Sequence, residues 1–597
     1  MSLRSVGQRV EETPQFRKLV QSVASRRPAV SISGLLSGGA KALVLAALAV
    51  TTQKLVAYIS AESELDSLVE EVQFFYDLIR NPQSLSADRQ AAIPVCRQAG
   101  RNPQSVVSIP AFDVDPYRGV SPHPAALEAR AHALYRLSRG EVRVALIPLR
   151  SWLTRTVPPA TIRQLGCELQ VGEEYPFEDL VNLLPRVGYR QEDPVTTVGE
   201  FSLRGGVLDV FTSAHARPLR LEFFGDVIES IREFDPDTQR SVARLQRVVL
   251  APMSEIAYDP EALRQWAEAA STRWVDPIFR RDLKAKSAFA EAGEAFQGWE
   301  FQVPLVRPHQ GTLFDYLPDA LLVLNEPTLL AGEMEKFFER MRAQYEEACE
   351  AGEVALDPEA FFLTPDQISQ QVGSFGRIEL STLGRAAMIH DAGFEFEDLG
   401  QRLATGDQRP EVGGLQVGVE EIALPATPMR RFHGQIQQVI DEINKAQWEQ
   451  MAVWVVARSV GMAERLVEML REYGVAVESW SDVTLPQNEP PASEILPVQV
   501  VVGRLTKGFI LPWARLCVLA ENDIFQEEHL EAMSSQTARR RMKASAFISD
   551  FRDLKPGDYV VHIDHGIGQF QGLVQLEGNG AGSREFLLLQ YADSGKL

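Results

Sequence analysis

The sequence predicts a multidomain α/β protein in which one α/β domain is interrupted by a β-rich insert and is followed by a small α/β domain and a small β-barrel. Three observations lead to this fold class. A chain of 597 residues is too long for a single core and indicates roughly three to five domains. Short apolar runs such as "KLVAYIS" and "VRVALIPL" alternate with helical patterns in the first third, as in a mostly parallel sheet. From Tyr175 to Pro252 strand-like runs are separated by turns, which indicates an antiparallel insert.

The later segments continue this pattern. After the insert, "LFDYLPDALLVLNEP" returns to a buried strand of the α/β type. A polar stretch rich in Gly, Pro and acidic residues, 400–428, predicts a linker, and helices and strands then alternate to about Phe525 without a motif that indicates a function. The final strands with glycine turns predict an SH3/Tudor-like barrel that stops at Leu597 in mid-pattern, so we expect a truncated barrel. The expected boundaries are 1–150 and 253–398 for the two halves of the interrupted α/β domain, 151–252 for the insert, 399–430 for the linker, 431–525 for the small α/β domain, 526–550 for a basic linker and 551–597 for the barrel.

Composition excludes several classes of protein. The formal net charge of −21 opposes binding of nucleic acid by the chain as a whole, so any such contact needs a local basic patch. The four cysteines are far apart, which argues against a zinc site and a disulfide framework and suits a reducing compartment. No secretion signal opens the chain, and the apolar run 42–50 is too short to span a bilayer. We therefore expect a cytoplasmic protein without a metal.

The stretch "SGLLSGGAKALVLAAL", 33–48, is similar to a phosphate-binding loop that has lost its ligands. Such a loop needs glycine before its lysine and a hydroxyl after it to hold magnesium, but Lys41 stands between Ala40 and Ala42. The strand that should end in Asp-Glu ends in Asn325 and Glu326, and asparagine lacks the negative charge that a magnesium site requires. Two elements are altered in the same sense, which predicts a degenerate, inactive nucleotide site. The alternatives are a glycine-rich turn before a buried helix and, for Glu326, an exposed acid at a strand end.

A second candidate site is the basic segment "ARRRMKASAFISDFRDLK", 538–555. Its positive side chains outnumber its negative ones and could contact DNA phosphates, or the segment could be a solvated helix face between two domains. The residues proposed for a DNA contact are Arg539, Arg540, Arg541 and Lys543.

The most specific segment lies in the expected insert. It contains "RGGVLDVF", "LEFFGDVIESIREFD" and "TQRS" in this order and resembles the segment shared by the excision-repair protein UvrB and the transcription-repair coupling factors (Mfd). The closing "GDYVVHIDHGIGQFQG" and "EFLLLQYA" resemble the RNA-polymerase-interacting, CarD-like domain of the coupling factors. The two segments in this order fit the N-terminal portion of a coupling factor, exclude UvrB itself, and extend the resemblance over nearly the whole chain. The ATP-driven helicase motor of that family would follow this portion.

The resemblance implies binding of the damage sensor UvrA through arginines of the insert. Arg204 in "SLRGG" matches best, Arg190 in "GYRQED" matches more loosely, and Phe211 is a possible apolar neighbour. Arginine suits a protein interface because its planar fork makes paired hydrogen bonds to carboxylates. The alternatives are a structural arginine that braces the turn Gly205-Gly206 and, for Phe211, core packing.

The resemblance also implies binding of the RNA polymerase β subunit through an edge strand of the barrel. The candidates in "REFLLLQYA" are Leu587, Phe586 and Arg584, although alternate positions of that strand could instead fill a barrel core. His562 and His565 flank Asp564, but no further ligand accompanies them, so a metal site is not expected there.

The function implied by the resemblance is transcription-coupled DNA repair. The family recognises RNA polymerase stalled at a lesion, releases it with ATP and recruits UvrA. This chain would supply UvrA binding and polymerase tethering, with no cofactor of its own, while ATP, Mg²⁺ and most DNA contacts would belong to the motor. An intact GKT and Asp-Glu pair would instead indicate an active helicase, and the sequence lacks both. A free-standing CarD-like polymerase adaptor without a repair role is the remaining alternative.

Overall fold

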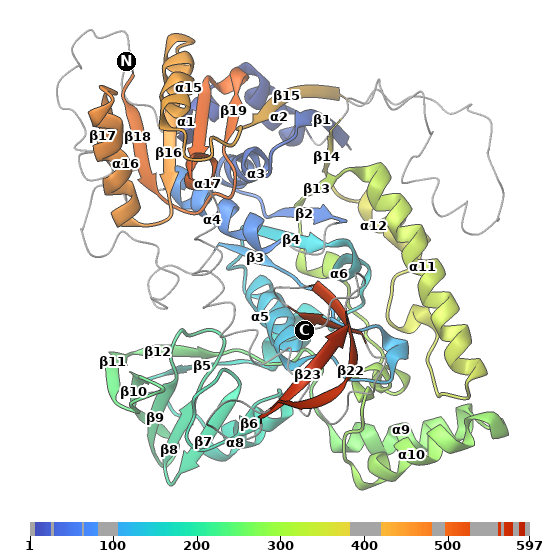
Figure 1. Cartoon of the computed structure of the whole chain (residues 1–597). Helices are drawn as coiled ribbons and strands as arrows, with labels where there is room; N and C mark the ends of the chain where they lie inside the picture. The colour runs from blue at the N-terminus through green and yellow to red at the C-terminus, as the bar shows by residue number, and fades with distance from the viewer. Residues whose placement is uncertain are drawn as a thin grey trace, which may run out of the picture. The chain divides into compact units, whose positions relative to one another are not determined.

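The computed structural model describes residues 6–25, 29–61, 65–80, 105–382, 420–479 and 496–525, together with three strands within 559–590. The chain divides into two units, 1–526 and 527–597, and each is described by itself. The mixed α/β class that the sequence predicts is confirmed (Figure 1).

The first unit is built on a twelve-stranded sheet with the order β17-β18-β16-β20-β19-β15-β1-β14-β13-β2-β4-β3. Its strands are β1 (Ala29–Leu35), β2 (Val56–Ser60), β3 (Val106–Ser108), β4 (Val144–Pro148), β13 (Leu321–Asn325), β14 (Arg377–Ser381), β15 (Glu420–Pro428), β16 (Ala452–Ala457), β17 (Val477–Ser479), β18 (Val498–Val502), β19 (Phe509–Leu511) and β20 (Leu516–Ala520). Strands β2, β4, β13 and β20 are buried along their full length, as expected for parallel strands covered on both faces.

Helices cover this sheet on both faces. Residues on opposite faces of one strand enter different cores: Tyr58 packs with α3 and α4, whereas Ala57 and Ile59 pack in the core that includes α5, α6 and α9. Around the first half of the sheet lie α1 (Val6–Glu11), α2 (Pro14–Ala24), α3 (Gly38–Thr52), α4 (Asp66–Arg80), α5 (Pro124–Ser138), α6 (Leu149–Leu153), α7 (Pro159–Gln164), α9 (Pro260–Arg273), α10 (Arg280–Ala292), α11 (Pro327–Glu350) and α12 (Pro365–Gly373). The second half carries α15 (Ile436–Trp448), α16 (Val460–Glu472) and α17 (Glu521–Ile524).

The two α/β segments expected to be separate share one sheet and one core. Residues 420–428 lie in the range expected to be a linker, yet they form β15, which pairs in parallel with β1 and in an antiparallel manner with β19. The expectation of a linker is therefore wrong for these residues. The reason is visible in the burial of Ile422, Leu424 and Ala426, which alternate with exposed residues as in a strand with one face on the core. Sequence composition hid this pattern because polar residues and prolines surround it.

The β-rich insert interrupts the first half of the sheet. Its six-stranded sheet has the order β11-β10-β9-β8-β7-β6, and β5 pairs with β12 beside it (Figure 1). The elements are β5 (Cys167–Gln170), α8 (Phe177–Arg186), β6 (Arg190–Gln191), β7 (Glu200–Arg204), β8 (Val207–Val210), β9 (Leu219–Phe224), β10 (Val227–Phe234), β11 (Ser241–Leu245) and β12 (Arg247–Leu250). One face of the sheet packs on α8 in a separate core, and polar side chains alternate onto the other face.

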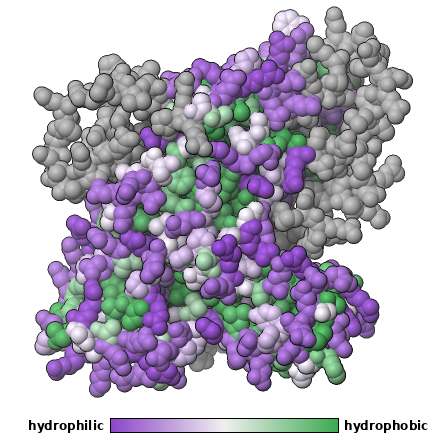
Figure 2. All heavy atoms as spheres, turned by 180° about the vertical axis from the view of Figure 1, so that it is seen from behind, coloured by the Kyte–Doolittle hydropathy of each residue, from purple (hydrophilic) through white to green (hydrophobic). Residues whose placement is uncertain are grey.

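The described strands of the second unit form a three-stranded antiparallel sheet of β21 (Tyr559–His562), β22 (Gly566–Leu576) and β23 (Arg584–Gln590). Three strands are compatible with part of a small barrel. On the face seen in Figure 2, hydrophilic residues are interspersed with hydrophobic patches.

Candidate functional site

The loop that the sequence likens to a phosphate-binding loop connects β1 to α3. Gly34 adopts a φ of 88°, a backbone conformation that glycine allows without strain, and α3 begins at Gly38. Lys41, in the first turn of α3, donates from its Nζ to the Asn325 Oδ1 at the end of β13, at 2.8 Å. Asn325 Nδ2 lies 3.5 Å from Ser60 Oγ at the end of β2. The two positions that sequence reasoning paired from separate motifs are therefore in direct contact.

Ala42 and Glu326 are not arranged to bind a nucleotide or Mg²⁺. Ala42, at the position of the magnesium-binding hydroxyl, is completely buried in the core and offers no oxygen. Glu326 adopts a left-handed backbone conformation at the start of α11 and accepts hydrogen bonds from the backbone and side chain of Thr382. Its carboxylate therefore holds Thr382, the residue that follows β14. The residues present do not fit ATP and Mg²⁺.

The space in front of α3 is filled by the second half of the sheet. A Cβ added to Gly39 would lie 2.8 Å from the Leu505 side chain and 2.9 Å from the Phe509 ring. The Phe509 ring also meets the Phe75 ring of α4 edge to face, with 6.1 Å between the centroids. A Cβ added to Gly503 would lie 2.1 Å from the Phe74 ring. The glycines at this contact thus permit close packing of protein against protein.

A buried carboxylate lies where α3 begins. The Oε2 of Glu71, on α4, would be 3.8 Å from a Cβ added to Gly38. Its Oε1 accepts a hydrogen bond from the backbone of Thr506 at 2.7 Å. Burial raises the pKa of Glu71, and the Thr506 backbone hydrogen bond opposes that rise. A phosphate loop binds its phosphate at the helix N-terminus, where the helix dipole favours negative charge. Here the carboxyl group of Glu71 lies near that end of α3.

The loop 503–509 is held from its other side as well. Asn522 Nδ2 donates to the Thr506 carbonyl at 3.2 Å, and Asp523 Oδ2 accepts from the backbone of Gly508 at 2.7 Å and of Ala520 at 2.8 Å. Burial raises the pKa of Asp523 to about 6. Arg504 also forms an ion pair with Glu70 of α4. The loop is thus anchored both in its own half of the sheet and on α4, and we call it the clasp loop (503–509).

The residues predicted for UvrA binding lie toward the β6 end of the insert sheet. Arg204 ends β7 and forms an ion pair with Asp193 in which both side chains are more than half exposed. Arg190, on β6, is also exposed and pairs in register with Glu200 of β7. The strand geometry therefore presents both arginines to solvent.

Phe211 is placed differently. It is 9% exposed and packs with Val195 and Phe234 in a small cluster of its own. Val195 belongs to the same loop as Asp193, so Phe211 lies beneath the segment that holds Arg204. Phe211 thus packs within the insert, and its contact with a partner stays a prediction.

The remaining sequence candidates are only partly within the described residues. Arg584, Phe586 and Leu587 lie on β23, opposite Leu576, Val574 and Leu573 of β22, and β23 pairs with no second strand among those described. Arg539, Arg540, Arg541, Lys543 and His565 lie outside the described residues. No group of three or more His, Cys, Asp or Glu side chains in the described ranges could hold a metal ion. No helix of the described part is long and apolar enough to cross a membrane.

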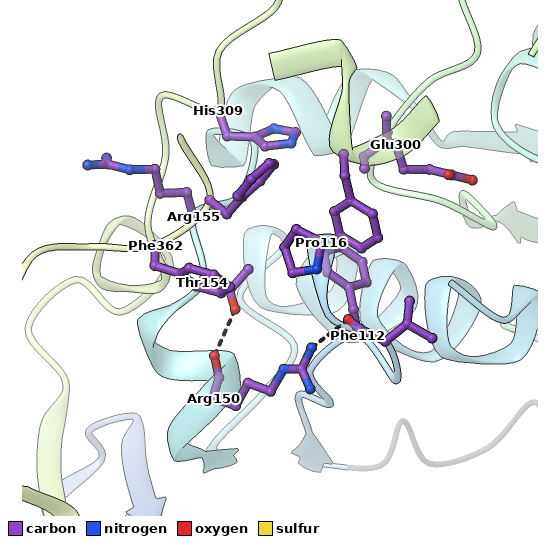
Figure 3. A pocket seen from close by; sticks show the side chains of 12 residues that line it. Phe112, Pro116, Arg150, Thr154, Arg155, Glu300, His309 and Phe362 are labelled. Atoms are coloured by element: carbon purple, nitrogen blue, oxygen red, sulfur yellow. Dashed lines mark hydrogen bonds between the residues drawn. The ribbon is translucent and has the colours of Figure 1, made fainter. Parts of the chain in front are cut away.

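One pocket lies beside α6 and is lined by Phe112, Arg150, Arg155, His309 and Phe362, among others (Figure 3). Its cations are already engaged: Arg150 pairs with Asp115 at 2.8 Å, and Arg155 donates to the Glu359 carbonyl at 2.9 Å. Burial lowers the pKa of His309, which keeps that side chain neutral. Of the two arginines, Arg150 is thus compensated by a carboxylate, whereas Arg155 is held only by neutral hydrogen-bond acceptors among the described residues.

Sequence reasoning missed Glu71, Leu505 and Asp193. Each contacts a neighbour that is remote along the chain or lies across a loop. Glu71 and Leu505 belong to no motif, and Asp193 ends "GYRQED" without a role of its own there. The only available signal was "QEDP", in which an acid stands eleven residues before Arg204.

The chain is similar to two domain families and to several curated proteins. The family described as UvrB interaction domain matches residues 167–256, and the family described as CarD-like/TRCF RID domain matches residues 554–597. A transcription-repair-coupling factor of Myxococcus xanthus is 29% identical over 94% of this chain and 44% of the relative. Those of Haemophilus influenzae and Escherichia coli are each 25% identical, over 86% and 83% of this chain and 42% and 40% of the relatives. The chain thus spans less than half the length of these relatives.

Proposed function

Because this chain is related to the bacterial transcription-repair-coupling factors over most of its length, we propose that it carries out the recruiting and tethering part of transcription-coupled DNA repair. In this proposal the insert binds UvrA, and the terminal unit binds RNA polymerase through its β subunit. The relatives extend beyond the matched portion, and we assign to that additional length the ATP- and Mg²⁺-dependent motor and most DNA contacts. In this proposal the chain acts in the cytoplasm, where the chromosome and RNA polymerase are.

The observation that carries UvrA binding is the position of Arg204. The matched interaction domain covers residues 167–256, and within it Arg204 and Arg190 stand exposed on neighbouring strands. The Arg204–Asp193 ion pair is exposed, so water screens it strongly and a partner carboxylate can compete for the guanidinium at little cost.

The experiment measures UvrA affinity by calorimetry for the chain and for Arg204→Ala. Loss of an interfacial arginine should cost roughly 2 kcal/mol or more, a tenfold or larger drop in affinity. Arg264→Ala is the matched control, because Arg264 also forms an exposed ion pair, with Glu261 on α9, and should leave affinity unchanged.

The variant Asp193→Asn distinguishes direct contact of Arg204 with UvrA from a structural role of Arg204 in its own loop. If Arg204 only supports the loop through Asp193, the two variants should weaken UvrA binding equally. If Arg204 touches UvrA, Asp193→Asn should keep or raise the affinity, because the arginine loses its competing partner. A chain that does not bind UvrA at all would refute this half of the proposal.

Polymerase tethering is supported by the match of residues 554–597 to the CarD-like domain and by β23, whose second edge has no partner among the described strands. Leu587→Glu should weaken capture of the polymerase β subunit, and Gln590→Glu on the same strand is the charge-matched control. Equal binding of the polymerase β subunit by the wild type, Leu587→Glu and Gln590→Glu would overturn the assignment of β23. A CarD-like adaptor without a repair role is disfavoured by the match of the insert to the UvrB interaction domain.

We also propose that the interrupted α/β module of this chain does not hydrolyse ATP. The proposal is supported by the absence of a hydroxyl at Ala42, the uncharged Asn325 and the placement of the Glu71 carboxylate beside Gly38. The boundaries 1–150, 151–252 and 253–398 of the interrupted domain and its insert, and 551–597 of the terminal domain, remain our assignment. Residues 431–525 are assigned to the second half of the shared sheet, and 526–550 are assigned as a basic linker whose Arg539, Arg540, Arg541 and Lys543 contact DNA.

A further inference from the structure

The edge strand β11 lies at the opposite end of the insert sheet from the arginines assigned to UvrA. Four strands lie between the edge strands β11 and β6, and the five strand spacings correspond to roughly 24 Å. Residues 241–244 of β11 are all exposed, and Val242 alone exposes 52% of its surface. Among the described residues β11 pairs only with β10. Its outer edge therefore carries backbone groups that no described strand satisfies.

This edge is basic. The segment 240–247, "RSVARLQR", contains Arg240, Arg244 and Arg247 and no acidic residue. Arg247 forms an ion pair with Glu168 of β5, whereas no ion pair of Arg240 or Arg244 is found among the described residues. The turn before β11 carries Asp235 and Asp237. The Asp235 carboxylate accepts from the backbone and hydroxyl of Thr238 at 2.9 Å, and Asp237 forms no ion pair with either arginine among the described residues. Two arginines at the edge are thus uncommitted.

A row of arginines leads to this edge across the sheet. Arg232 of β10 lies in register with Arg220 of β9 and with Arg244 of β11. Like charges directly opposite each other destabilise a sheet unless acidic partners compensate. Arg220 has Asp209, with two hydrogen bonds of 2.7 Å, and Arg232 has Glu222, at 3.0 Å. Arg244 is the member of the row for which a carboxylate is still missing.

We propose that β11 binds an extended acidic segment of a partner protein, which adds a strand to the insert sheet and places its carboxylates on Arg244 and Arg240. The free backbone edge selects an extended chain, and Val242 offers it an apolar contact. The arginines select acidic side chains. They also disfavour a second copy of this chain, because pairing of two β11 strands would bring both sets of arginines together. Duplex DNA is disfavoured as the occupant because it has no extended peptide backbone that could pair with the free edge of β11.

The probe is a fluorescein-labelled peptide of alternating Glu and Val, nine residues long, titrated with the whole chain and followed by anisotropy. We expect saturable binding that weakens as salt rises from about 50 to about 300 mM, since the ion pairs are exposed. Arg240→Glu combined with Arg244→Glu should weaken binding at least tenfold. The matched control, Arg280→Glu with Arg281→Glu on the exposed face of α10, changes the net charge equally and should leave binding unchanged.

Two further peptides test separately whether binding needs acidic side chains and whether it needs strand pairing. Replacing Glu by Gln should abolish binding, and replacing alternate Val by Pro should do so too, because proline cannot donate to a ladder of strand hydrogen bonds. Equal binding of the proline peptide, no effect of the Arg240/Arg244 double variant, or stronger binding of a duplex DNA of equal charge would each overturn the proposal. Arg204→Ala should bind the peptide normally, so failure of this inference and failure of the UvrA assignment are distinguishable.

Discussion

The Lys41 ammonium donates to the Asn325 carboxamide at 2.8 Å and so joins two elements that lie 284 residues apart in the sequence. In a phosphate loop this lysine would meet the phosphates of a nucleotide. Here it is held against the end of β13, and the clasp loop packs over Gly39 on the same helix. This end of the sheet is a contact between two halves of one protein.

Restoring the motif residues should not restore nucleotide binding. The triple variant Ala40→Gly, Ala42→Thr and Asn325→Asp returns the turn glycine, the hydroxyl and the acid, but Glu71, Leu505 and Phe509 still fill the space. We expect no binding of a fluorescent ATP analogue with Mg²⁺ by the wild type or by the variant. Micromolar binding by the triple variant would show that the missing ligands, and not the filled space, inactivate the loop.

Gly39→Ala tests the packing of the clasp loop. The added methyl group would meet side-chain atoms of Leu505 and Phe509 at 2.8–2.9 Å, so we expect a loss of about 1–3 kcal/mol in the free energy of unfolding from overpacking. Gly332→Ala is the control, because that glycine lies within α11 with open space at its Cβ, and alanine there should stabilise by up to about 1 kcal/mol. Thermal unfolding measures both, and a rise in Tm for Gly39→Ala would contradict the packing.

Asp523 should make the stability of the first unit depend on pH. Its pKa is raised from 3.8 to about 6 by burial, so the folded state favours the protonated carboxyl. The contribution is fully present below pH 3.8 and is lost as the pH rises through about 6; it amounts to roughly 3 kcal/mol between these limits. Lys507 and Arg431 are the cations that oppose the shift.

The measurement compares urea unfolding of the wild type and Asp523→Asn at pH 5 and pH 7.5. Asparagine does not titrate, so the stability of the wild type relative to the variant should fall between pH 5 and pH 7.5. Because both proteins share all other titrating groups, their contributions cancel in the difference. A difference that stays constant would mean that the Asp523 pKa is close to its ordinary value.

Glu255→Gln should be strongly destabilising. Arg130 is completely buried, and its Nε donates to Glu255 Oε1 at 2.7 Å, while Thr156 donates to the second carboxylate oxygen. Removing the negative charge leaves the guanidinium buried without compensation, at a cost of about 3–5 kcal/mol. Denaturant unfolding measures it, with Glu261→Gln in the exposed Arg264–Glu261 pair as the control, expected to change stability by less than about 1 kcal/mol.

The α/β class, the β-rich insert and the departures from a phosphate loop at Ala40, Ala42 and Asn325 could be predicted from the sequence. These features are local: apolar runs of strand length, turn residues and short motifs are written in neighbouring residues, and a missing hydroxyl or carboxylate is visible without coordinates. The resemblance to the coupling factors rested on such segments too.

The contacts between these distant segments could be seen only in the folded structure. It placed β15 between β1 and β19, where composition indicated a linker, and brought Leu505 and Phe509 against Gly39. It also paired Arg204 with Asp193 and buried Phe211. Such contacts join residues that are distant in the chain, and they depend on strand register and on the packing of shared cores. No spacing or composition encodes them locally, because each side chain gains its role from a neighbour that the fold supplies.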